Sequence, residues 1–139
     1  MVYSRNECEM IYNGMRKIEE WIKKNVTPNV RDDIVIGFGG IVRRGYYNDI
    51  KEQKYELCIT NEHIIGHIGG LRLIFPDMDD WHIESYSPFT VKMYKGRGGS
   101  YDVEFAASLI ENWAMVKSSI CNKLDEQISK IEKISNFVV

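Results

Sequence analysis

The segment YDVEFAASLIENWAMVKSSICNKLDEQISKIEKIS, residues 101–135, decides the fold of this 139-residue chain because one apolar period runs through all of it. The apolar positions are Phe105, Leu109, Trp113, Val116, Ile120, Leu124, Ile128 and Ile131. Their mean spacing of about 3.7 residues is closer to the 3.6 residues of an ordinary helical turn than to the 3.5 of a left-handed coiled coil. The segment therefore predicts a long C-terminal helix that packs on a globular core.

The predicted helix is too long for a domain of this size. At 1.5 Å per residue it measures about 52 Å, whereas a compact domain of this length is roughly 37 Å across. Two outcomes are open. The helix breaks, most plausibly at the poor helix formers Ser118, Ser119 and Asn122, or its end projects and packs on a partner.

The apolar period continues to the end of the segment. Ile128, Ile131 and Ile134 follow one another at spacings that keep them close on the helix surface. An exposed stripe of isoleucines would be an association surface. Since two-fold oligomers are common, we expect a homodimer through the C-terminal helix.

The N-terminal region predicts a second helix, over about residues 5–24. Ser4 and Glu7 form a capping box, and the pattern stops before Pro28, which cannot continue a helix. Its apolar face comprises Cys8, Ile11, Met15, Ile18 and Ile22.

The sequence pattern between residues 34 and 94 predicts a series of short strands. They are expected at 34–36, 41–42, 55–59, 63–65, 71–75, 82–86 and 90–94. Short connections and turn residues favour antiparallel hairpins. The expected fold is α+β: an N-terminal helix, a curved antiparallel sheet of about five to six strands and a long C-terminal helix, in a single domain covering residues 1–139.

Composition narrows the class of protein. Apolar residues make up 44% of the chain and charged residues 27%, which is ordinary globular usage. The net charge of −2 argues against general nucleic-acid binding or membrane binding through bulk charge.

Three widely spaced cysteines, Cys8, Cys58 and Cys121, make a poor disulfide framework. With no apolar signal segment at the start, we expect a cytoplasmic protein without a membrane span.

A glycine-rich run is the best candidate for small-molecule chemistry. Arg97, Gly98, Gly99 and Ser100 stand where the last helix is expected to begin. Backbone N–H groups at a helix N-terminus can bind phosphate, and arginine adds bidentate contacts. The run matches neither a Walker loop nor a dinucleotide fingerprint. It could equally be a connection in which Ser100 caps the helix.

Arginine and tyrosine on the sheet could extend that site. Arg43, Arg72 and Tyr94 lie on expected strands, and stacking side chains of this kind can hold a nucleotide. If they meet Arg97, the result is a ligand-binding pocket for a phosphorylated small molecule. The alternative is a solvated sheet face.

Two clusters with metal-ligand chemistry are assigned no metal. Asp77, Asp79, Asp80, His82 and Glu84 follow one another, but on a strand residues four apart lie about 13 Å from each other. This acidic segment is better explained as a contact patch for a basic partner. A second group, Glu62, His63 and His67, has strand rather than helix neighbours and does not match a zinc-protease motif.

No motif anchors catalysis. A nucleophile elbow of the form G-x-S-x-G is missing from the sequence, and Cys58 is expected mid-strand, pointing inward. No residue is predicted to be catalytic and no cofactor is expected. The sequence leaves enzymatic activity open: a non-enzymatic protein is expected first, with a small hydrolase as the remote alternative.

The last third, from Leu109–Trp113 to Lys130–Phe137, resembles the ends of small uncharacterised proteins from phages and prophages of AT-rich bacteria. The resemblance implies a cytoplasmic accessory protein that acts by binding. The first expected function is therefore that of a phage-type inhibitor, which binds a host defence protein. The alternative is a module that sequesters or senses a nucleotide signal.

Overall fold

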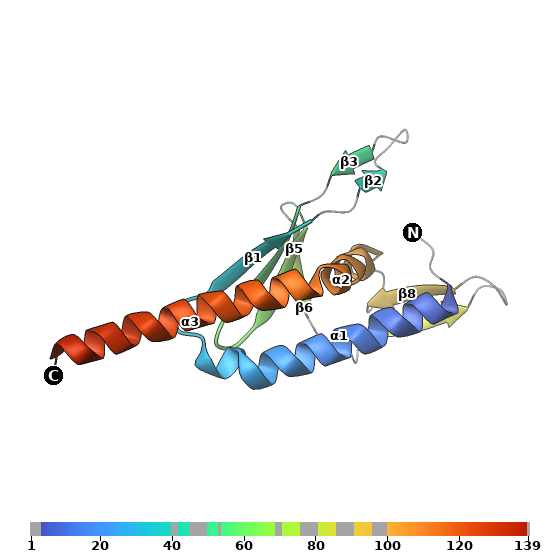
Figure 1. The fold of residues 1–139 in the computed structure, drawn as a ribbon. Coiled ribbons are helices and arrows are strands. Elements are labelled where there is room, and N and C mark those ends of the chain that lie inside the picture. Colours follow the sequence, from blue (N-terminus) through green and yellow to red (C-terminus); the bar gives the residue numbers. More distant parts are fainter. Residues whose placement is uncertain are drawn as a thin grey trace.

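The computed structural model describes residues 4–39, 42–44, 50–52, 54–68, 71–75, 81–85, 91–95 and 100–138, with side chains for 4–39, 54–67 and 105–137. The chain has the α+β architecture that the sequence predicts, with a helix first and a long helix last (Figure 1). The helical elements are α1 (Arg5–Asn25), the single-turn η1 (Thr27–Asn29), α2 (Ser100–Glu111) and α3 (Trp113–Val138). The strands are β1 (Ile34–Phe38), β2 (Val42–Arg44), β3 (Ile50–Glu52), β4 (Tyr55–Ile59), β5 (Ile64–Ile68), β6 (Leu71–Phe75), β7 (Trp81–Ser85) and β8 (Val91–Lys95).

Within the described residues the strands pair antiparallel, as expected, but they are divided among three sheets. The main sheet has four strands in the order β1-β4-β5-β6, and β2-β3 and β7-β8 form two separate pairs. The prediction of one sheet of about five to six strands is therefore not confirmed. Consecutive strands are joined by short connections, and such connections produce local hairpins whether or not these join a common sheet.

Helix α1 forms where the capping box predicts. The Glu7 amide donates to Ser4 Oγ at 3.1 Å, and the Ser4 amide donates to Glu7 Oε1 at 3.2 Å. These bonds satisfy two N–H groups that a helix start leaves without partners. All five apolar residues expected on its inner face are buried: Cys8, Ile11, Met15, Ile18 and Ile22.

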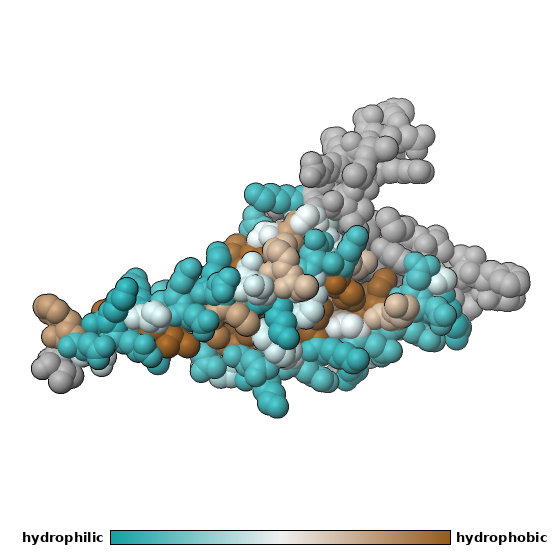
Figure 2. Space-filling view, viewed as in Figure 1, coloured by the Kyte–Doolittle hydropathy of each residue, from teal (hydrophilic) through white to brown (hydrophobic). Residues whose placement is uncertain are grey.

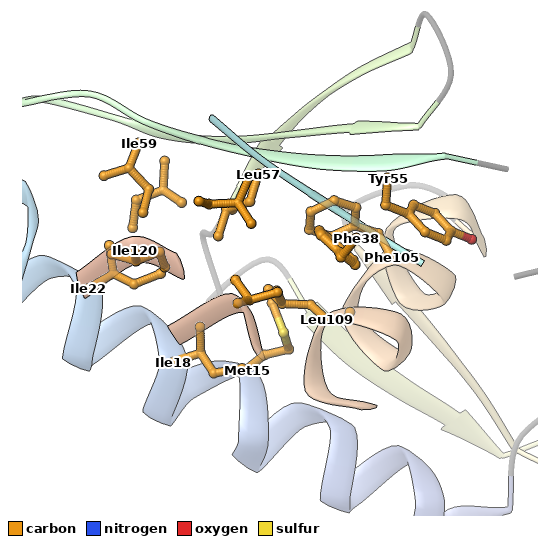
Figure 3. Packing of buried hydrophobic residues seen from close by; sticks show 14 of the residues in the cluster. Met15, Ile18, Ile22, Phe38, Tyr55, Leu57, Ile59, Phe105, Leu109 and Ile120 are labelled. Carbon is orange, nitrogen blue, oxygen red and sulfur yellow. The ribbon is translucent and has the colours of Figure 1, made fainter. Parts of the chain in front are cut away.

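One hydrophobic cluster joins the three helices to one face of the main sheet (Figure 3). Strands β1 and β4 alternate strictly, so that Tyr55, Leu57 and Ile59 face the helices. At one end of the cluster the Phe105 ring of α2 lies edge-on to Phe38 and Tyr55, with centroids 5.4 and 5.8 Å away. Because this one cluster contacts every long helix, it fixes the direction in which α3 leaves the sheet.

Two glycines allow close approach inside this cluster. A Cβ atom on Gly66 of β5 would lie 2.7 Å from Phe105 Cζ. A Cβ atom on Gly14 of α1 would lie 2.8 Å from Ile110 Cδ1. Helix α2 therefore packs on β5 and α1 at distances that only glycine permits without rearrangement.

The C-terminal helical segment is interrupted at Asn112, not at Ser118–Asn122 as the sequence suggested. Both the backbone amide and the side-chain Nδ2 of Asn112 donate to Ser108 O, at 3.0 and 2.8 Å. A side chain that competes for a helix carbonyl favours a local turn. By contrast, α3 runs without interruption from Trp113 through Ser118 and Ser119 to Val138.

Candidate functional site

The end of α3 projects beyond the rest of the described fold (Figure 1). Among the described residues, Gln127 is the last of α3 with a hydrogen bond to the body: its Oε1 accepts from the amides of Arg31 and Asp32 at 3.0 and 3.2 Å. Its Nε2 donates to Asp32 O at 2.7 Å. Every described side chain after Gln127, from Ile128 to Phe137, is exposed. The helix therefore leaves the body at Gln127, and residues 128–138, about 16 Å of helix, form what we call the projecting end.

Four large apolar side chains stand on the projecting end, three residues apart. Ile128 and Ile131 are each 43% exposed, Ile134 is 58% exposed and Phe137 is 91% exposed. We call this set the apolar ridge. Figure 2 shows hydrophobic surface among the hydrophilic residues of this part of α3.

Sequence reasoning identified three of the four ridge residues and missed Phe137. The sequence was sufficient to identify Phe137, because this residue continues the spacing of three residues from Ile134. Gln127 was missed as well. Its role depends on a loop nearly 100 positions earlier in the chain, and no local pattern marks it.

The predicted phosphate site is only partly covered by the described structure. Arg43, Arg72 and Tyr94 lie on β2, β6 and β8, which belong to three different sheets. Ser100 begins α2, as expected for the end of the glycine run. Arg97, Gly98 and Gly99 lie outside the described residues. Strand β8 contacts α2, so Tyr94 and Ser100 stand on neighbouring elements.

The acidic segment is likewise covered only in part. His82 and Glu84 lie on β7, where the register pairs them with Tyr94 and Lys92 of β8. Asp77, Asp79 and Asp80 lie outside the described residues. The predicted strand at His82 and Glu84 is therefore confirmed.

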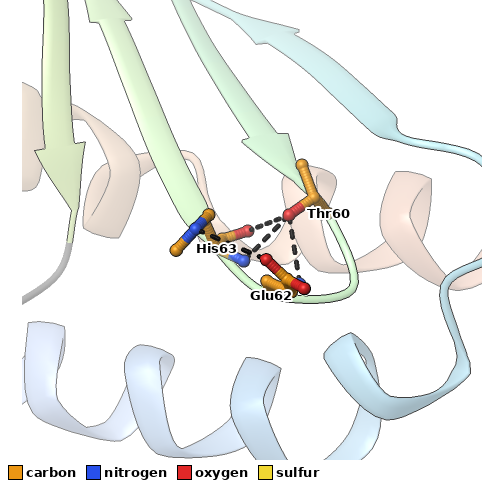
Figure 4. Close-up of polar contacts among 3 residues, drawn as sticks. All are labelled: Thr60, Glu62 and His63. Carbon is orange, nitrogen blue, oxygen red and sulfur yellow. Dashed lines mark hydrogen bonds and ion pairs between the residues drawn. The ribbon is translucent and has the colours of Figure 1, made fainter.

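Of the two histidines expected on strands, His67 lies on β5, whereas His63 lies in the turn that precedes it. Glu62 and His63 occupy the β4–β5 turn, where Thr60 Oγ1 accepts from both of their amides at 3.2 and 2.8 Å (Figure 4). His63 Nε2 lies 3.8 Å from Glu62 Oε2, and both side chains are exposed. His67 lies further along, on β5. Among the described residues, no group of three His, Cys, Asp or Glu side chains could hold a metal ion.

The cysteines are thiols, with Cys8 buried and the other two half-buried. Burial raises the pKa of the Cys8 thiol, and the neighbouring Glu7 and Glu9 carboxylates raise it further. Cys8 therefore stays protonated at neutral pH and is a poor nucleophile. The expectation that Cys58 points inward is wrong. Tyr55, Leu57 and Ile59 face the core, so the intervening Cys58 lies on the opposite face of the sheet.

Together the fold and the surface describe an α+β protein with an amphipathic helix that extends past its own core. No protein-family model, curated protein or solved structure matches the chain. Within the described part of the chain, none of the helices is both long and apolar enough to cross a membrane.

Proposed function

We propose that this chain is a non-enzymatic cytoplasmic binding protein that acts through protein–protein contact. In this proposal the apolar ridge is its association surface and mediates a homodimer. The observation that carries the proposal is the uninterrupted exposure of α3 from Ile128 to Phe137, on a segment that retains three isoleucines and a phenylalanine.

Two physical reasons favour a partner on this surface. Isolated exposed apolar residues are ordinary, whereas a contiguous apolar row is typical of interaction sites. In addition, three helical turns without tertiary packing are marginal in water, and Ser129, Ser135 and Asn136 are poor helix formers. Burying the ridge against a partner would stabilise both the helix and the apolar side chains.

The ridge is tested by replacing Ile131 and Ile134 with serine in the full chain. We expect the wild-type protein to have about twice the monomer mass of 16.2 kDa in light scattering at concentrations on the order of tens of micromolar. The double variant should have the monomer mass, because its two most central ridge contacts are lost. Met10→Ser on α1 is the matched control, since Met10 is 70% exposed and lies far from the ridge. A wild-type protein of monomer mass would contradict the proposed homodimer.

The resemblance to phage and prophage proteins supports one class of target. We propose that the dimer binds a host defence protein, as such accessory proteins do. The acidic segment around His82 and Glu84 is the proposed contact for a basic surface of that target. In this scheme the ridge joins two copies and leaves the acidic segment of each for the target.

A phosphorylated small molecule is the second proposed ligand, because Tyr94 and Ser100 stand on neighbouring elements, β8 and α2. Arg97, Gly98 and Gly99 would then supply charge and amides to the phosphate, and Arg43 and Arg72 would add further charge. In calorimetric titrations with nucleotides, Arg97→Ala should weaken binding at least about tenfold, which corresponds to about 1.4 kcal/mol. Unchanged thermal unfolding of the variant serves as the control. If no nucleotide binds the wild type, or if Arg97→Ala binds equally well, this second ligand class is wrong.

A further inference from the structure

We propose that Lys123 and Gln127 of α3 cover one edge of the main sheet, and that this cover prevents β1 from pairing with a strand of another chain. We call these two side chains the polar latch. The polar latch acts within a single copy of the chain, so it does not depend on the apolar ridge or on the proposed homodimer. Three features support it: the place of β1 in the sheet, the hydrogen bonds along its edge and the residues of the strand itself.

Strand β1 stands at one end of the main sheet. In the described order β1-β4-β5-β6 it is hydrogen-bonded to β4, and helix α3 also contacts it. An antiparallel strand directs its backbone groups alternately toward its two edges, so every second residue of β1 turns its N–H and C=O groups away from β4. We call this side of β1 the outer edge. When such an edge is open, another chain can add a strand to it.

Helix side chains bond to carbonyl groups along the outer edge. Lys123 Nζ donates to Val35 O at 2.9 Å. Ser108 Oγ of α2 donates to Gly39 O, just after the strand, at 2.8 Å. Val35 and Gly39 are an even number of residues apart, so the alternation of the strand turns both carbonyls to the same side. The helices therefore cover this edge through side-chain donors.

Gln127 extends the cover to the residues that precede β1. Its Oε1 accepts from the amides of Arg31 and Asp32, and its Nε2 donates to Asp32 O. A carboxamide carries the same kinds of donor and acceptor as a peptide group. Gln127 thus makes backbone contacts of the kind that a peptide group of a neighbouring strand would make. Because Lys123 and Gln127 are four residues apart, both reach the edge from one side of α3.

The residues of β1 explain why a cover is needed. The strand Ile34–Phe38 consists of β-branched and aromatic residues with one glycine, and it contains no charged residue and no proline. Segments of this composition pair readily with other chains when their edge is open. A lysine at the edge and a helix along it are both devices that prevent this pairing in other proteins. The polar latch combines the two.

The test removes the polar latch by Lys123→Ala and Gln127→Ala in the full chain. The parent for this test is the Ile131→Ser, Ile134→Ser variant, so that association through the apolar ridge does not enter the comparison. In light scattering at concentrations on the order of tens of micromolar, the latch variant should have a mean mass at least about twice that of the parent, because an added strand requires a second copy.

The matched control removes the same two chemical groups from another helix. Asn13→Ala and Lys24→Ala in the same parent delete one carboxamide and one ammonium group from exposed positions of α1. This variant should keep the mass of the parent. A mass that rises equally in the control would contradict a specific role of Lys123 and Gln127.

Val35→Pro shows whether the outer edge is the surface that associates. Proline lacks the N–H group that an added strand would bond, yet edge strands accept it. Added to the latch variant, it should return the mean mass to that of the parent. Urea unfolding verifies that each variant is folded. If the latch variant does not unfold cooperatively, Lys123→Ala alone provides the same comparison, since it removes one exposed bond.

Two results would overturn the inference. One is a folded latch variant that keeps the mass of its parent. The other is a rise in mass that Val35→Pro leaves unchanged, because the copies would then associate through a different surface. Neither result bears on the proposed homodimer, which is tested by the mass of the wild-type chain.

Discussion

Changing Gly66 to alanine should lower the free energy of unfolding by about 1–3 kcal/mol, even though it adds only one methyl group. The new Cβ would lie 2.7 Å from Phe105 Cζ and 3.0 Å from both Cε atoms. Phe105 is 1% exposed, and its ring packs edge-on against Phe38 and Tyr55, which stack on each other. A ring enclosed on several sides cannot move aside without disturbing the cluster that orients α3.

A double-mutant cycle identifies the cause. Phe105→Leu removes the ring atoms that the new methyl group would meet, so Gly66→Ala should cost less in that background. Urea unfolding of the four proteins gives the coupling energy. An equal cost of Gly66→Ala in both backgrounds would contradict the steric explanation. Gly14→Ala is the matched control, since its Cβ meets only the side chain of the half-buried Ile110, at 2.8 Å from Cδ1 and 3.3 Å from Cγ1. It should be nearly neutral because alanine is better in a helix by about 1 kcal/mol.

Local patterns predicted the helices well. Ser4 and Glu7 predicted the start of α1 because a capping box acts within a single turn. The apolar period of residues 101–135 predicted a long final helical segment, and the expected size of the domain left two outcomes open, a break or a projecting end. The structure has both, a break at Asn112 and a projecting end after Gln127. The isoleucines of the ridge were recognisable for the same reason.

Features that depend on distant contacts were not predictable in this way. The division of the described strands among three sheets depends on which hairpins meet, and strand β3 has no strong local signal. At the turn the Asn112 side chain donates to Ser108 O, whereas Ser118 and Ser119 are tolerated inside α3. Gln127 ends the contact with the body through the backbone of Arg31 and Asp32.

The inward orientation predicted for Cys58 was wrong for a different reason, because the strand pattern in the sequence is enough to predict the opposite orientation. In β4 the alternation of Tyr55, Leu57 and Ile59 places these larger apolar residues on one face. With a period of two, Cys58 must then face the other way. Its apolar character was given more weight than its position in the strand.

The second large effect is expected at the projecting end itself, where helix formation should depend on association. The side chains from Ile128 to Phe137 are all exposed in the single chain, so the helix there should open easily when the partner is absent. Val116 and Ile120 are fully buried in the core of each copy. Their amides should exchange slowly at any protein concentration.

Amide hydrogen exchange of residues 128–138, measured before and after about 100-fold dilution of the wild-type chain, tests the central claim most directly. We expect exchange at the projecting end to be at least about tenfold faster in the dilute sample, while the amides of residues 116–124 keep their rates. In the Ile131→Ser, Ile134→Ser variant the projecting end should exchange quickly at both concentrations. Equal rates at residues 128–138 in the concentrated and dilute wild-type samples would contradict the claim that this segment is where the chain associates.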